Sequence, residues 1–161
     1  MNWDQLFDTQ QQLDKRIKDN HQLHEEDLFD KKVLALLVEI GELANETRCF
    51  KFWSKKSPSE TNIILDEYVD GIHFILSLGL EKGLSYETQP IDNHQLDVTK
   101  QFNHVFEKVL AFKELPNKET YHQLFQSYLC LGDMLGFDEQ SVKDAYDQKN
   151  EINHQRQEQG Y

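Results

Sequence analysis

Apolar side chains recur at intervals of three and four residues along most of the chain, and strictly alternating apolar and polar residues are nearly absent. Such spacing places the apolar groups on one face of an α-helix. The pattern predicts about six helices, at residues 3–19, 26–50, 58–81, 98–115, 121–135 and from 138 onward. A chain of this kind is expected to form an all-α helical bundle.

The third helix is expected to begin at the segment SPSE. Ser57 can cap the helix, Pro58 suits the first helical position, and Glu60 can close a capping box.

The composition predicts a single folded domain over residues 1–161. Its 38% of hydrophobic residues can form a core even though 29% of the residues are charged. The net charge of −12 repels phosphate backbones and argues against nucleic-acid binding. The segment MNWDQLFD lacks the features of a signal peptide, and no apolar run is long enough to cross a membrane, so a cytoplasmic protein is expected.

Two pairs of acidic residues interrupt the most apolar helices. In VLALLVEIGELA, residues 33–44, the only charged residues are Glu39 and Glu42, and Glu67 and Asp70 repeat the same spacing in the next helix. Residues three apart share one side of a helix. Twenty-four residues separate Glu42 from Glu67. At a rise of ~1.5 Å per residue, two antiparallel helices joined by a short turn would therefore bring the pairs to the same level.

Four carboxylates that face one another in an apolar setting are costly without a cation. Oxygen ligands without cysteine favour Mg²⁺, with Mn²⁺ as an alternative. Glu39, Glu42, Glu67 and Asp70 are therefore predicted to bind metal. Salt bridges on a solvated face are the alternative explanation. Di-iron bundles use a Glu-x-x-His motif on each of two helices. The two acidic helices contain no Glu-x-x-His and only one related motif, Asp70-x-x-His73, so a di-iron site is disfavoured.

Two glycines lie inside the same helices, where each costs ~1 kcal/mol relative to alanine. Gly41 and Gly71 therefore predict a close approach of the two helix backbones.

The acidic pattern, Glu39-x-x-Glu42 followed by Glu67-x-x-Asp70, resembles the signature of the all-α nucleoside triphosphate pyrophosphatases. That superfamily includes MazG-type enzymes and dimeric dUTPases. Three further stretches resemble the dimeric dUTPases in particular: TQQQLD, CFKFWSKK and AYDQKNEINHQRQEQGY. Together with EYVDGIHF, they span essentially the whole chain.

The resemblance implies a homodimeric enzyme that hydrolyses dUTP to dUMP and pyrophosphate, with dUDP as a second candidate substrate. It implies attack at the β-phosphorus, with Mg²⁺ held by the four acids and Glu42 orienting the attacking water as general base. By position, Gln10 and Trp53 correspond to family residues associated with the uracil and sugar pocket, and Asp14 is a further candidate.

Two features of the residues themselves agree with this interpretation. Gln10 interrupts an apolar stripe, and an amide offers both a donor and an acceptor to a uracil edge; the alternative is a polar residue at the helix boundary. The last helix turns from apolar to basic at Lys149, Asn153 and Arg156, which predicts a phosphate clamp; the alternative is a frayed, solvated terminus.

Three further residues complete the predicted site. Lys51 and Lys55 lie in a basic segment after the acidic helix and are expected to seat triphosphate oxygens. His73 is expected to hydrogen-bond one of the acids rather than bind metal.

The sequence leaves two other functions open. One is a pyrophosphatase that accepts several nucleotides, and the other is a regulator-binding protein with a dUTPase fold.

Overall fold

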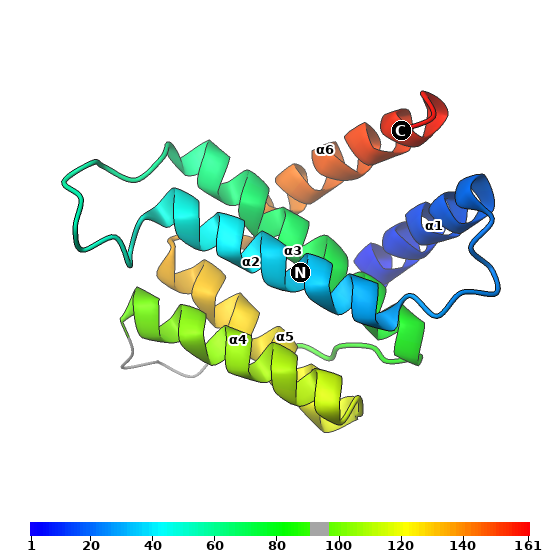
Figure 1. Ribbon diagram of the computed structural model, residues 1–161, viewed down its shortest axis with the longest axis horizontal. Coiled ribbons are helices and arrows are strands. Elements are labelled where there is room, and N and C mark those ends of the chain that lie inside the picture. The colour runs from blue at the N-terminus through cyan, green and yellow to red at the C-terminus, as the bar shows by residue number, and fades with distance from the viewer. Residues whose placement is uncertain (91–96) are drawn as a thin grey trace.

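The structure, a computed structural model, describes residues 1–90 and 97–161 (Figure 1). These residues contain helices and no strand, so the predicted all-α class is confirmed. None of the helices in these two ranges combines the length and the apolar character needed to cross a membrane. The helices are α1 (Trp3–His21), α2 (Phe29–Thr47), α3 (Thr61–Lys82), α4 (Val98–Glu114), α5 (Lys118–Met134) and α6 (Glu139–Glu158).

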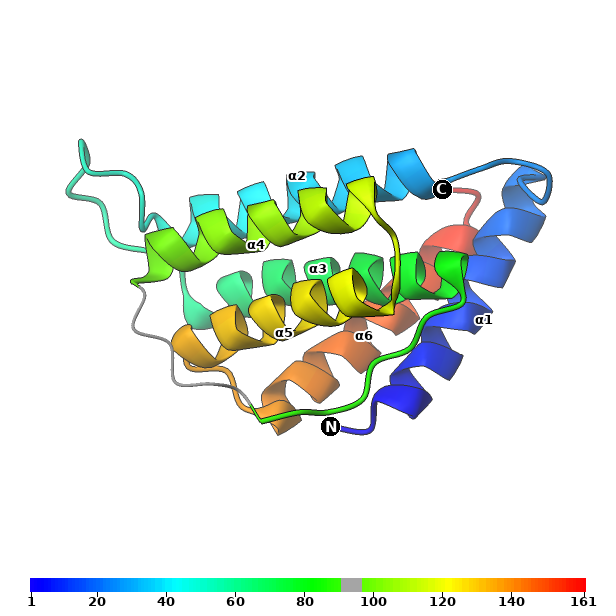
Figure 2. The ribbon, with the colours of Figure 1, turned by 90° about the horizontal axis from the view of Figure 1, so that it is seen from below.

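Four of the helices form a bundle. α2 and α3 are an antiparallel pair with the most extensive contact in the molecule, and α4 and α5 form a second pair (Figure 1). α2 packs on α4 and α3 packs on α5. α1 and α6 contact each other and cover the remaining side of α3, as Figure 2 shows. α3 is therefore the central helix of the fold.

Burial along α3 reflects this position. Ten of the twelve residues from Tyr68 to Gly79 are buried. The two exceptions, Asp70 and Phe74, are half-buried and lie one turn apart. The side of α3 that carries Asp70 is therefore only partly covered by the neighbouring helices.

Tyrosine and glycine pairs hold α3 against α5. The rings of Tyr68 and Tyr128 stack with centroids 4.8 Å apart, and each hydroxyl donates a hydrogen bond to the other residue's carbonyl oxygen, at 3.2 Å and 2.8 Å. A Cβ on Gly71 would overlap the Tyr128 hydroxyl, and one on Gly132 would overlap the Tyr68 hydroxyl. Gly71 therefore permits a close approach, as predicted, but the partner is a side chain of α5 rather than the backbone of α2. For Gly41 the prediction is wrong, because a Cβ there would meet nothing within 4 Å.

The predicted start of the third helix is also wrong. α3 begins at Thr61, and Glu60 is its N-cap residue without a side-chain hydrogen bond. Ser59 donates its backbone N–H to the carbonyl oxygen of Glu46 at 3.0 Å and its hydroxyl to the Glu46 carboxylate. These contacts tie Ser59 to the last turn of α2, and α3 begins after them.

The two glycines form a matched pair for a stability measurement. We expect Gly71→Ala to lower the free energy of unfolding by about 1–3 kcal/mol, because the buried Tyr128 ring must move. Gly41→Ala is expected to be neutral or to stabilise the protein by up to about 1 kcal/mol through helix propensity. Urea unfolding of both variants measures the difference. Equal effects of the two substitutions would contradict the packing described above.

Candidate active site

Three of the four predicted metal ligands meet between α2 and α3. Glu39, Glu67 and Asp70 each place a carboxylate oxygen within 4.8 Å of the others. They come together because the antiparallel helices bring two acidic turns to the same level. All three side chains are half-buried, so water can replace only part of the stabilisation that a cation would supply.

Glu42 lies at the rim of this cluster. Its side chain is exposed on α2 and does not belong to the group of three. Its charge nevertheless helps to raise the pKa of both Glu39 and Glu67, which indicates that the Glu42 carboxylate is near them. Glu42 is thus accessible to water at the edge of the site.

The cluster carries more negative charge than its surroundings compensate. Burial, followed by the charges of Asp70, Glu42 and Glu67, raises the pKa of Glu39 from 4.5 to about 7. Burial also raises the pKa of Glu67 and of Asp70, the latter in spite of the Lys149 ammonium group at 2.7 Å from its carboxylate. Closely spaced carboxylates with raised pKa values are a donor set that suits a hard divalent cation.

A pocket of about 450 Å³ opens beside the acidic cluster, between α1, α2, α3 and α6. Its volume is in the range of small-molecule sites. Glu39 and Asp70 line one end, and Phe74, one turn from Asp70, lines the wall. The predicted phosphate-binding residues Asn153 and Arg156 also line it, from α6. An acidic cluster that could hold a cation and a ligand-sized space are therefore adjacent.

A buried polar network forms the inner wall of the pocket. Gln10 is 3% exposed. Its side-chain nitrogen donates to the Asp14 carboxylate at 2.8 Å, and its oxygen accepts from the Tyr146 hydroxyl at 2.8 Å. The same oxygen lies 2.7 Å from Nδ1 of His73. A carboxylate can only accept a hydrogen bond, so Asp14 fixes the Gln10 amide with the amide nitrogen toward Asp14 and the amide oxygen toward His73.

His73 therefore has a defined protonation pattern. Nδ1 must carry the hydrogen that it donates to Gln10, which leaves Nε2 as an acceptor. Among the described residues, the buried Nε2 atom has no hydrogen-bond partner. Burial, followed by the charge of Lys149, lowers the pKa of His73 to about 3, so the ring is neutral near pH 7. The expected partner of His73 was an acid, and the structure shows the Gln10 amide instead.

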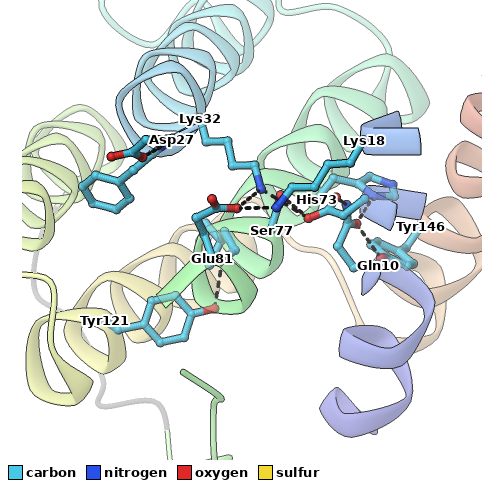
Figure 3. Close-up of polar contacts among 12 residues, drawn as sticks. Gln10, Lys18, Asp27, Lys32, His73, Ser77, Glu81, Tyr121 and Tyr146 are labelled. Carbon is cyan, nitrogen blue, oxygen red and sulfur yellow. Dashed lines mark hydrogen bonds and ion pairs between the residues drawn. The ribbon is translucent and has the colours of Figure 1, made fainter. Parts of the chain in front are cut away.

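Lysines on the pocket wall were not predicted from the sequence. Lys32, 12% exposed, lies 2.7 Å from Glu81 and 3.4 Å from Asp14, and Lys18 lies 3.2 Å from Glu81. Figure 3 shows Lys18 and Lys32 converging on Glu81 beside the Gln10, His73 and Tyr146 side chains. For Lys32, the sequence contains a signal that could have been used: Lys32 precedes Glu39 by seven residues and therefore lies on the same side of α2.

Three predicted residues lie elsewhere. Lys51, Trp53 and Lys55 belong to the connection between α2 and α3, and none of them lines the pocket of the same chain. Trp53 is 65% exposed. In Figures 1 and 2 this connection projects from the end of the α2–α3 pair that is remote from α1. Trp53 therefore lies outside the pocket of its own chain.

Comparison with known families agrees with this geometry. A family model described as dUTPase matches residues 2–161. The chain belongs to the dimeric, all-α dUTPase family. This dUTPase family membership indicates a nucleotide-processing hydrolase. No curated protein sequence matches the chain.

The raised pKa of Glu39 predicts how the metal-free protein responds to pH. Between about pH 4.5 and 7, the unfolded chain ionises Glu39 while the folded chain still holds the proton, so folding stability falls as pH rises through this window. Glu39→Gln removes this contribution. We expect the melting temperature of the variant, relative to the natural chain, to rise from pH 4.5 to pH 8 in EDTA.

Adding Mg²⁺ at pH 8 is expected to reduce the difference in melting temperature between Glu39→Gln and the natural chain, because metal binding stabilises the natural chain more than the variant. Melting curves at pH 4.5, 6 and 8 measure both effects. If the melting temperatures of the two proteins changed with pH in parallel, ionisation of Glu39 would not be the cause of the loss of stability.

Proposed function

We propose that this dUTPase-family protein is a Mg²⁺-dependent dUTP diphosphatase, with Mn²⁺ as an alternative metal and dUDP as a second candidate substrate. The observation that carries the proposal is the convergence of Glu39, Glu67 and Asp70 beside a pocket that His73 lines, with the buried Nε2 atom of His73 left without a hydrogen-bond partner among the described residues. The acidic cluster alone would indicate phosphate chemistry without a nucleobase, and the pocket alone would indicate a bound nucleobase without that chemistry.

The acidic residues divide the chemistry between them. Glu39, Glu67 and Asp70, with Glu42 at the rim, would hold the metal ions. Bound Mg²⁺ supplies charge neutralisation to the phosphates and makes water more acidic. The exposed Glu42 carboxylate would take the proton from the attacking water. The water oxygen bonds to the β-phosphorus, the bond from that phosphorus to the bridging oxygen of dUMP breaks, and pyrophosphate leaves with the new oxygen.

The basic residues of α6 would bind the phosphate chain. Lys149 already contacts Asp70 at 2.7 Å, and Arg156 lines the pocket while remaining exposed. A guanidinium group can bind phosphate oxygens through two hydrogen bonds. We expect Arg156, on the pocket wall, and Lys149, beside Asp70, to bind oxygens of a nucleotide whose phosphates lie at the acidic end.

The uracil ring of the substrate would occupy the part of the pocket that His73 lines. Nε2 of His73 can accept the hydrogen on N3 of uracil. The side chain of Gln10 already contacts Asp14, Tyr146 and His73, so its proposed role is to position His73. This assignment modifies the expectation that Gln10 itself reads the uracil edge.

Pyrophosphate release from a panel of deoxynucleoside triphosphates and UTP tests the proposal directly. We expect strong selectivity for dUTP with Mg²⁺, and a loss of about 100-fold or more in kcat for Glu67→Gln, because the variant removes one of the negative charges that hold the metal. Asp66→Asn, at an exposed neighbouring carboxylate, is the matched control.

The other outcomes have definite meanings. Hydrolysis of several nucleotides with similar efficiency would favour a broad pyrophosphatase. Absence of hydrolysis for every nucleotide would favour the regulator-binding role.

We also propose that the protein acts as a homodimer. Leu34 and Val38 lie one turn apart on α2, are 63% and 49% exposed, and precede Glu42 by one further turn on the same side. Covering them with a second copy would remove apolar surface from water next to the acidic site. The exposed connection with Trp53, Lys51 and Lys55 would then serve the pocket of the other subunit.

Subunit mixing tests this arrangement. We expect Trp53→Ala and Glu67→Gln each to be nearly inactive alone. After exchange of subunits, half of the dimers contain one chain of each kind, and one of their two sites has both natural residues, so about a quarter of the natural activity should return. If Trp53 served its own pocket, mixing would restore nothing.

A charged substitution on α2 provides the control for this experiment. Adding Leu34→Glu to both variants should abolish the recovery by preventing association. Leu110→Glu on α4 is the matched control, because Leu110 is also apolar and 49% exposed. Recovery that survives Leu34→Glu would place the subunit contact elsewhere.

A further inference from the structure

The orientation of one buried amide determines the hydrogen-bonding character of the unpartnered Nε2 atom of His73, a residue that lines the pocket. With the Gln10 oxygen toward His73, Nδ1 must donate and Nε2 is an acceptor. With the Gln10 nitrogen toward His73, Nδ1 must accept and Nε2 carries the hydrogen. The two orientations have the same shape but opposite hydrogen-bonding character at Nε2.

Asp14 is the group that distinguishes the two orientations. Its Oδ1 atom accepts from the Gln10 nitrogen at 2.8 Å, and an ionised carboxylate has no hydrogen to offer the Gln10 oxygen. Its other oxygen accepts from the Ser77 hydroxyl at 2.5 Å and lies 3.4 Å from the Lys32 ammonium group. Asp14 is therefore held in place from α2 and α3 and cannot turn away from Gln10 without losing these contacts.

We propose that Asp14 is a positioning residue for base selectivity: by fixing the Gln10 amide, it keeps His73 in the Nδ1–H tautomer and makes Nε2 an acceptor. The inference rests on the proposed dUTPase function, because it assigns the base to this part of the pocket. Asp14 acts through Gln10 and His73 rather than on the base itself.

The chemistry of the bases makes the consequence specific. N3 of uracil carries a hydrogen, whereas N3 of cytosine is a lone-pair acceptor. An acceptor at Nε2 pairs with uracil and leaves two lone pairs facing each other with cytosine. Sites built around such hydrogen bonds can reject the wrong ligand by factors of about 10⁴. Thymine also carries a hydrogen on N3, so this device separates dUTP from dCTP and not from dTTP.

The local environment maintains the neutral ring on which this depends. His73 is buried, its ring stacks on Tyr146 at 4.1 Å, and burial lowers its pKa to about 3. A second proton is therefore not added near neutral pH, and the tautomer alone decides the character of Nε2.

Asp14→Asn is expected to reverse the tautomer. Lys32 can only donate, so the oxygen of the introduced amide should face Lys32 and Ser77 while the nitrogen of that amide faces Gln10. Gln10 must then present its oxygen to the introduced nitrogen and its own nitrogen to His73. Lys32 remains paired with Glu81 at 2.7 Å, so the substitution leaves no buried ammonium group without a partner.

The first measurement is a two-bond ¹H–¹⁵N correlation spectrum of histidine-labelled protein, which distinguishes the two tautomers without substrate. We expect Nδ1–H for His73 in the natural protein and Nε2–H in Asp14→Asn. Asp8→Asn, an exposed carboxylate on the same helix, should retain Nδ1–H, as should Tyr146→Phe, in which Asp14 still orients Gln10.

The second measurement is selectivity. The ratio of kcat/KM for dUTP over dCTP should fall by about tenfold or more in Asp14→Asn and remain unchanged in Asp8→Asn. Binding of dUMP and dCMP, measured by calorimetry, should change in the same direction.

The outcomes separate this inference from the proposed function. An Nε2–H tautomer in the natural protein overturns the inference, even if Asp14→Asn does not fold. Retention of Nδ1–H and of full selectivity in Asp14→Asn also overturns it, while the dUTPase function stands. Preferential binding of dUMP that Asp14→Asn abolishes, without hydrolysis of any nucleotide, would support the inference and reject the proposed function.

Discussion

The constraint on which the structure depends is that α3, the central helix, carries a stripe of polar side chains through a buried environment. The stripe consists of Asp70, His73, Ser77 and Glu81 at helical spacing. A buried polar group without a partner is costly, so each of these needs a group from another helix. Lys149 of α6 contacts Asp70, Gln10 and Asp14 of α1 contact His73 and Ser77, and Lys32 of α2 contacts Glu81. Satisfying one stripe therefore brings three helices around one pocket.

The two ends of this stripe differ in electrostatic balance, and the difference defines the functional site. At the Glu81 end, contacts with Lys32 and Lys18 outweigh burial and lower the pKa of the carboxyl group. At the Asp70 end, burial and neighbouring acids raise the pKa values of Asp70 and Glu39 despite Lys149. Only the second end gains substantially from an added cation. A structural ion-pair network and a metal-type cluster thus occur within a few turns of the same helix.

Prediction from the sequence succeeded where a feature depends on spacing within a helix or between two adjacent helices. Glu39, Glu67 and Asp70 converge because the helical repeat and a short connection place them at one level. Gln10 on α1, and Asn153 and Arg156 on α6, line one pocket, and their roles in binding a nucleotide stay predictions. The start of α3 was predicted wrongly because the capping signal at Ser57 competes with the contacts between Ser59 and Glu46, which join segments separated along the chain.

The sequence by itself determined the all-α class, the paired acidic motifs and the family, because these depend on local periodicity and on residue types at fixed spacings. Only the tertiary structure decided that Glu42 lies at the rim, that Trp53 lies away from the pocket of its own chain, and that His73 bonds to Gln10. These features depend on how helices cross and on which side chain is available to satisfy each buried polar atom. Helical spacing places a side chain on one face of its helix, whereas the opposing helix determines its partner.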